Sequence, residues 1–183
     1  MNRRSSSKIS LFLMELIIAI LFFSLASAVC VRLFTSAHTL SVDSINLSNS
    51  VTWSQNLAEA FYGCKGQLKD MEKLYPQAFI STDDDDKNRS TVILFFNEEW
   101  DLNEEGLVDA AFEAILETDR MSAKEAYADV NSYGVDLMGD AISGRVAVID
   151  LRGTTEVFSS IPNDNSRTIF TMPVDIYVGK EDQ

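Results

Sequence analysis

The sequence predicts an α+β fold in which one long N-terminal helix packs on a small antiparallel β-sheet head. A continuous apolar run extends from Ile9 to Val31, and apolar residues then recur at three- and four-residue steps up to Tyr75. This spacing is typical of one face of a helix. From residue 76 onward, short β-rich runs alternate with polar turns, which indicates a sheet. The 183 residues leave room for one modest head domain besides the helix.

The apolar run is long enough to span a membrane only if it includes a carboxylate. Its 23 residues from Ile9 to Val31 would form a helix of about 34 Å, whereas the 16 uncharged residues from Leu16 to Val31 fall short of the ~20 required. A spanning helix must therefore carry Glu15 into the bilayer. A charge near the bilayer core costs roughly 2.5–3.5 kcal/mol, so Glu15 calls for a partner or a role.

Charge is distributed unevenly along the chain, whose net charge is −13. Residues 1–35 hold four of the 15 Lys and Arg residues but only one of the 28 acidic residues, so the remainder is strongly acidic. Basic residues on the short N-terminal flank (Arg3, Arg4 and Lys8) predict that residues 1–8 stay in the cytoplasm and that the head is exported. An acidic head is repelled by phosphate backbones, so nucleic acid is not an expected partner of the head.

Three familiar kinds of N-terminal segment fit less well. A secretory signal peptide would explain Ala26-Ser27-Ala28 as a cleavage site, but the apolar run is long for that class and Glu15 interrupts it. A lipoprotein signal needs a small residue before the cysteine, and Val29 precedes Cys30. A plain signal anchor explains the length and the basic flank but gives Glu15 no role.

The stretch Lys8–Ile20, KISLFLMELIIAI, resembles the N-terminus of type IV pilins and pseudopilins, the prepilin-type cleavage and methylation segment. In that family a prepilin peptidase removes a short basic leader on the cytoplasmic face. The mature chain then begins with an apolar residue and has Glu at its fifth position. The resemblance places the cut between Ser10 and Leu11 and makes Glu15 the fifth residue. The family usually has Gly before the cut, where this chain has Ser10.

This resemblance implies a layout and a function. Residues 1–10 would be the leader, 11–34 the transmembrane half of the helix, 35–75 its amphipathic half and 76–183 the extracytoplasmic head. Cleavage would free an α-amine at Leu11, and the Glu15 carboxylate would pair with that amine in its own chain or in a neighbouring subunit. The expected partners are the bacterial plasma membrane, a prepilin peptidase and other pilin-like subunits. The chain would be a minor pilin or a pseudopilin of a secretion or competence system.

The alternative is a single-pass, membrane-anchored extracytoplasmic binding protein that does not polymerise. No enzyme is expected, because the single histidine, His38, lies near the predicted membrane edge and leaves no His-based triad. No phosphate-binding loop, metal-ligand spacing or catalytic carboxylate pair stands out, so catalytic residues, metal, cofactor and small-molecule substrate are all expected to be absent. Cys30 and Cys64, about 50 Å apart on one helix, are expected to be free.

The long helix is predicted to end at Tyr75, before Pro76 and the head, although Gly63 and Gly66 allow an earlier end or a kink. Residues 81–90, with four consecutive aspartates, read as a loop. Residues 110–117 fit either a strand or a helix, and 122–130 favour a helix. The sheet is expected to have four or five strands, including 91–96, 145–151, 156–161 and 169–178, with a turn at 152–155.

Overall fold

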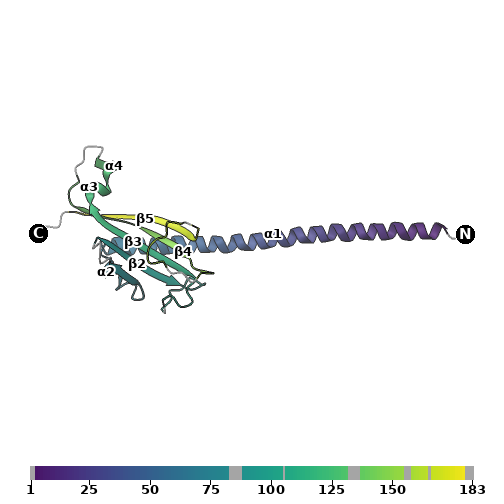
Figure 1. Cartoon of the computed structure of the whole chain (residues 1–183), viewed down its shortest axis with the longest axis horizontal. Coiled ribbons are helices and arrows are strands. Elements are labelled where there is room, and N and C mark those ends of the chain that lie inside the picture. The colour runs from purple at the N-terminus through teal and green to yellow at the C-terminus, as the bar shows by residue number, and fades with distance from the viewer. Residues whose placement is uncertain are drawn as a thin grey trace. The chain divides into compact units, whose positions relative to one another are not determined.

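The computed structural model describes residues 3–82, 88–104, 106–131, 137–154, 158–164 and 166–179. It shows a long helix and a five-stranded antiparallel sheet, which confirms the predicted α+β layout (Figure 1). In chain order the elements are α1 (Arg3–Gly63), α2 (Leu68–Met71), β1 (Phe79–Thr82), β2 (Arg89–Phe96), β3 (Phe112–Ser122), α3 (Ala123–Ala126), α4 (Ala128–Asn131), β4 (Asp140–Asp150) and β5 (Thr168–Gly179).

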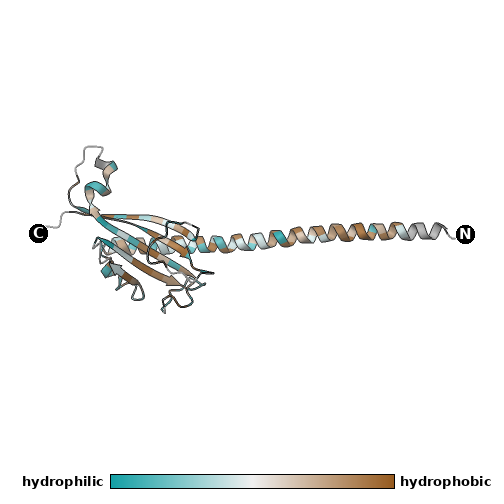
Figure 2. Ribbon diagram, in the orientation of Figure 1, coloured by the Kyte–Doolittle hydropathy of each residue, from teal (hydrophilic) through white to brown (hydrophobic). Residues whose placement is uncertain are grey.

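The chain divides into two compact units, Met1–Ile45 and Asn46–Gln183, and α1 runs through both. Much of α1 in the first unit is hydrophobic, as the brown ribbon in Figure 2 shows. Every side chain from Ser10 to Ser41 is exposed. This part of α1 is long and apolar enough to cross a membrane. A helix that is apolar on all sides has no single face to bury against a protein core.

In the second unit, α1 buries one face. Asn46, Ser50, Ser54, Leu57 and Phe61 recur at three- and four-residue steps and are all buried. The predicted stripe was therefore right toward the end of the helix, but Leu40 and Leu47 are exposed. Small polar residues take the inward positions at the start of this face, and the Ser50 hydroxyl donates to the Asn46 carbonyl at 2.7 Å.

The strands form a simple meander in the order β1-β2-β3-β4-β5, with every neighbouring pair antiparallel. The central pair is the longest, because β3 and β4 stay in register from Phe112 opposite Asp150 to Ser122 opposite Asp140. Gly144 lies in the middle of β4, opposite Thr118. A Cβ at this position would overlap the Glu117 carbonyl oxygen, so the close spacing of the two strands requires glycine here.

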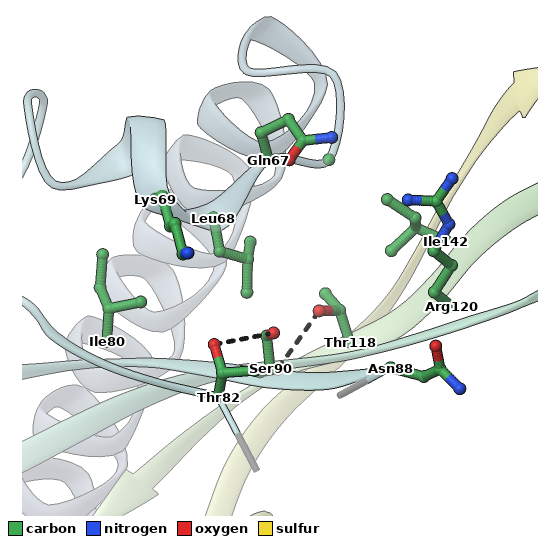
Figure 3. Close-up of a pocket in the computed structure, with 11 residues that line it drawn as sticks. Gln67, Leu68, Lys69, Ile80, Thr82, Asn88, Ser90, Thr118, Arg120 and Ile142 are labelled. Carbon is green, nitrogen blue, oxygen red and sulfur yellow. Dashed lines mark hydrogen bonds between the residues drawn. The ribbon is translucent and has the colours of Figure 1, made fainter. Parts of the chain in front are cut away.

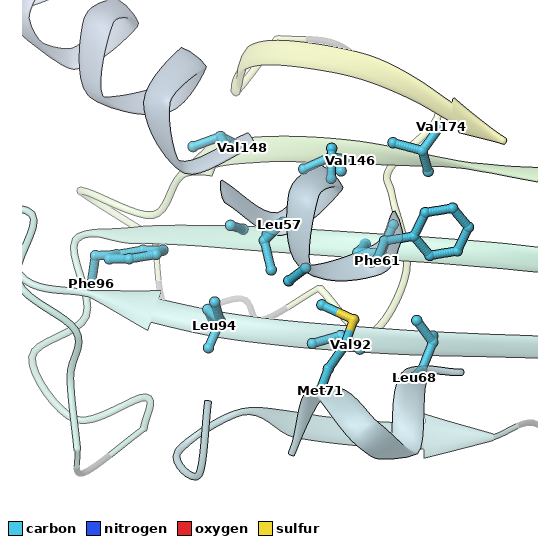
Figure 4. Packing of buried hydrophobic residues seen from close by; sticks show 14 of the residues in the cluster. Leu57, Phe61, Leu68, Met71, Val92, Leu94, Phe96, Val146, Val148 and Val174 are labelled. Carbon is cyan, nitrogen blue, oxygen red and sulfur yellow. The ribbon is translucent and has the colours of Figure 1, made fainter. Parts of the chain in front are cut away.

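The main core lies between the sheet and the last turns of α1 (Figure 4). Leu57 and Phe61 of α1 are fully buried, and α2 adds Met71 to the same cluster. The strands contribute alternate residues such as Val92 and Val146, as expected for a sheet with one face turned to a core. Fully burying such a side chain contributes about 1.5–3 kcal/mol, so this face holds the head together.

A stack of aromatic rings closes one end of this core. The Trp100 and Phe112 rings lie 4.0 Å apart at 15°, and the Arg152 guanidinium lies 4.9 Å from the centre of the Phe112 ring. Trp100 donates its indole N–H to the Asn46 side-chain oxygen at 3.2 Å. This bond satisfies two buried polar groups at once and fixes the start of the buried face of α1.

Helix α1 ends at Gly63 rather than at Tyr75, so the earlier end that the glycines allowed is the correct one. The Gly66 N–H donates to the Phe61 carbonyl and the Lys65 N–H to that of Tyr62, which is the Schellman pattern of a helix end. Lys65 and Gly66 both have positive φ, and a Cβ on Gly66 would lie 2.6 Å from Ile142. The chain therefore reverses here, and α2 follows as a separate turn.

The strand predictions were right for three of the four segments. Residues 158–161 form no strand, and β4 instead pairs with β5. The ambiguous segment 110–117 enters β3, and the helical segment 122–130 forms the short α3 and α4. The ends of the predicted loop 81–90 are strand residues, with Thr82 opposite Ser90; its aspartates lie outside the described residues.

The close approach at Gly144 predicts that Gly144→Ala destabilises the head by about 1–3 kcal/mol, because backbone atoms must move to admit the methyl group. Gly63→Ala is the matched control. A Cβ at Gly63 meets nothing within 4 Å, and alanine favours helix by up to about 1 kcal/mol. Urea unfolding of the full chain in detergent, followed by Trp53 and Trp100 fluorescence, measures both. Equal stability of Gly144→Ala and the wild type would contradict this packing.

Candidate functional site

The three residues singled out by the sequence lie close together on the exposed part of α1. Leu11 is 65% exposed, and Ser10 and Glu15 are also exposed. Because Leu11 and Glu15 are four residues apart, they lie on the same face of the helix. Phe12, Met14 and Ile18 are exposed apolar neighbours of these two residues on the same helix. The helix thus brings Glu15 within one turn of the residue that would become the new N-terminus.

The Ser10–Leu11 bond lies inside α1, which begins at Arg3. The carbonyl and N–H groups around this bond belong to the helical backbone, so a peptidase would have to unwind the first turns to reach it. Side-chain exposure at Ser10 leaves that approach unobstructed by the rest of the unit.

Several hydroxyl groups on this part of α1 form hydrogen bonds within the helix. The Ser24 hydroxyl donates to the Ile20 carbonyl at 2.8 Å, and the Thr35 hydroxyl donates to the Arg32 carbonyl at 2.9 Å. Such bonds make a hydroxyl compatible with an apolar surrounding. No hydrogen bond or ion pair within the described residues reaches the Glu15 carboxylate. The exposed Glu15 carboxylate is therefore open to a group from outside the described residues.

The head carries a groove of about 480 Å³ beside the end of α1 (Figure 3). Its apolar lining includes Leu68, Ile80 and Ile142, and two basic residues, Lys69 and Arg120, also line it. Arg120 forms an ion pair with Asp140, in which its Nη2 atom lies 3.0 Å from the Asp140 Oδ2 atom.

The hydroxyl groups of Thr118 and Ser90, which line the groove, form hydrogen bonds with other residues of the sheet. The Thr118 hydroxyl donates to the Ser90 carbonyl at 3.2 Å, and the Ser90 hydroxyl lies 3.5 Å from that of Thr82.

A second carboxylate in an apolar setting was missed by the sequence reasoning. Glu113 on β3 is fully buried. Burial raises the pKa of Glu113 to about 7, and the hydrogen bond from the Phe158 N–H only partly offsets this rise. The signal was present in the sequence, because Glu113 interrupts the apolar run from Ala110 to Leu116 much as Glu15 interrupts the N-terminal run.

Both cysteines are free: Cys30 is exposed on α1 and Cys64 is half-buried just beyond its end. Burial raises the pKa of the Cys64 thiol, and the nearby Asp70 carboxylate raises it further. His38 is exposed on α1. Among the described residues, no group of three or more His, Cys, Asp or Glu side chains is placed to hold a metal ion.

Comparison with protein-family models, curated proteins and solved structures finds no match.

Proposed function

We propose that this protein is a pilin-like subunit of a type IV pilus or pseudopilus, anchored in the bacterial plasma membrane by α1 and assembled through it. The observation that carries the proposal is the position of Glu15 in an exposed apolar helix, four residues after Leu11. The segment needs an apolar environment, and its carboxylate needs a positively charged partner.

The exposure of α1 supports the first requirement. Leu11, Phe22 and Phe34 are 65%, 66% and 78% exposed, and they represent an apolar surface that extends around the helix. Exposed apolar surface on this scale indicates contact with lipid or with another protein. A lipid bilayer and a bundle of identical helices would both cover it. The basic flank at Arg3, Arg4 and Lys8 favours a cytoplasmic N-terminus.

The α-amine of a processed chain would meet the second requirement, a positively charged partner for Glu15. Cleavage before Leu11 would create a positive charge one helical turn from the Glu15 carboxylate, at the edge of the apolar segment. Two opposite charges in an apolar surrounding cost less together than apart. When the amine belongs to a neighbouring subunit, the same pair also sets the stagger between two helices. Pairing of this kind would make Glu15 an assembly residue and Ser10 and Leu11 processing residues.

The first prediction concerns processing. The full chain, produced with a prepilin peptidase, should lose residues 1–10, and without the peptidase it should keep them. Ser10→Gly, which restores the residue usual in the family, should be processed at least as completely. Intact-mass spectrometry measures both. An unchanged mass for wild type and Ser10→Gly with the peptidase present would refute processing, and loss of residues 1–28 would indicate a secreted head instead.

The second prediction concerns assembly. Glu15→Ala should insert at least as well as the wild type, because it removes a charge that costs roughly 2.5–3.5 kcal/mol in the bilayer, and it should assemble poorly. Ser24→Ala is the matched control, since the Ser24 hydroxyl is already bonded within the helix. The amount of subunit in filaments sheared from cells that carry the assembly machinery reports the result. Normal assembly of Glu15→Ala would refute the role of Glu15.

A further inference from the structure

The face of the sheet opposite α1 carries its own small core. Phe95, Ile115, Ala147 and Ile149 are buried there, and Ile161 packs on them from the connection between β4 and β5. Phe158 lies half-buried against the same cluster. The segment Phe158–Ile161, which we call the cover segment, therefore seals an apolar patch that would otherwise face solvent.

Glu113 is part of this patch, because it is opposite Phe95 on β2 and Ile149 on β4. Its side chain is fully buried. One carboxyl oxygen accepts a hydrogen bond from the Phe158 N–H at 3.3 Å, and the other has no partner among the described residues. Within the described residues, the one bond to this buried carboxyl therefore comes from the cover segment itself. An ionised carboxylate in such a site is poorly compensated, whereas the protonated form is tolerated.

Charged side chains on neighbouring elements lie elsewhere. A separate hollow on the same face of the sheet is lined by four charged residues: Arg89, Glu117, Asp119 and Arg145. The nearest of these to Glu113 along β3 is Glu117, which is four residues away, or about 13 Å. No shift in the pKa of Glu113 arises from any of them.

The connection between β4 and β5 has its own charged groups. Arg152 forms an ion pair with Asp150 at 2.7 Å, and its guanidinium lies against Phe112 in the main core, across the sheet from Glu113. Arg167 donates to the Asp150 and Arg152 carbonyls, and Asp164 accepts from the Ser166 N–H. Burial alone would raise the pKa of Asp150, but the bonds and charge of Arg152 lower it, so this anchor stays ionised at neutral pH.

We propose that Glu113 is a proton-dependent latch: the protonated carboxyl is tolerated beneath the cover segment, whereas an ionised carboxyl favours lifting of the segment, because the cost of burying its charge exceeds the gain from the Phe158 bond. The Arg152–Asp150 pair and the bonds from Arg167 hold the described residues at the two ends of the connection. On the proposed function the head faces the exterior, where pH is not held constant. The latch would then couple external pH to exposure of the apolar patch.

Proton linkage gives the direction in which pH shifts the opening of the cover segment. With the cover segment seated, the Glu113 pKa is about 7, and with the segment lifted, the carboxyl meets water and the pKa returns toward its ordinary value of 4.5. The closed state therefore binds the proton more tightly, so rising pH favours opening. The change develops between these two pKa values and levels off above the higher one.

Hydrogen exchange of the full chain in detergent, followed residue by residue and corrected for the intrinsic pH dependence, tests the latch. The amides of Phe158–Ile161 should exchange on the order of tenfold or more faster at about pH 8.5 than at about pH 5.5, and the rate should level off above pH 7. Amides of β2 and β3 should show no parallel change. Glu113→Gln should make the cover segment independent of pH, and Glu117→Gln, a matched change on the same face, should behave like the wild type.

Two results would contradict the latch proposal. One is amide exchange of the wild-type cover segment that does not depend on pH, and the other is a pH dependence of this exchange that remains in Glu113→Gln. A parallel loss of protection in β2 and β3 would overturn its local character. If Glu113→Gln does not fold, titration of the wild-type Glu113 carboxyl by carbon-13 NMR replaces it. A transition at the ordinary pKa of an exposed carboxyl would then contradict the proposal. None of these results depends on whether the chain is processed or assembles.

Discussion

The change in the surroundings of α1 along its length is the constraint on which the rest of the structure depends. Up to Ser41 the helix exposes every described side chain, and from Asn46 onward it buries one face under the sheet. In proteins most of the stability of a helix comes from packing of its apolar face, so each part needs its own packing partner. The sheet provides it for the second unit. For the first, the proposed function assigns that role to lipid and neighbouring helices.

Two carboxylates interrupt apolar runs in this chain, and the fold treats them differently. Glu15 is exposed on a helix, so a partner from another molecule or from a processed N-terminus can reach it. Glu113 is enclosed between strands and the cover segment, where no second molecule has access. The first arrangement suits intermolecular pairing, and the second suits control by a proton. Burial, rather than residue type, therefore separates the assembly role proposed for Glu15 from the switching role proposed for Glu113.

Much of the fold could be predicted because the signals were local. The apolar run to Val31, the β-rich segments of β2, β4 and β5, and the glycines near the end of α1 each depend on neighbouring residues. The errors came from distant contacts. The partner of β4 is β5, because the intervening connection packs over the sheet instead of adding a strand. Likewise, the burial of Glu113 depends on segments 45 residues apart, which periodicity does not reveal.

Reaction of the two cysteines in native membranes tests the central claim most directly, namely that the first part of α1 lies in lipid. Cys30 is exposed on the apolar segment and Cys64 lies in the second unit, so each reports on one part of the chain. With a membrane-impermeant maleimide applied from the head side, we expect Cys64 to react slowly, as its raised pKa implies, and Cys30 to be spared until detergent is added. Rapid labelling of Cys30 in intact membranes would contradict the account.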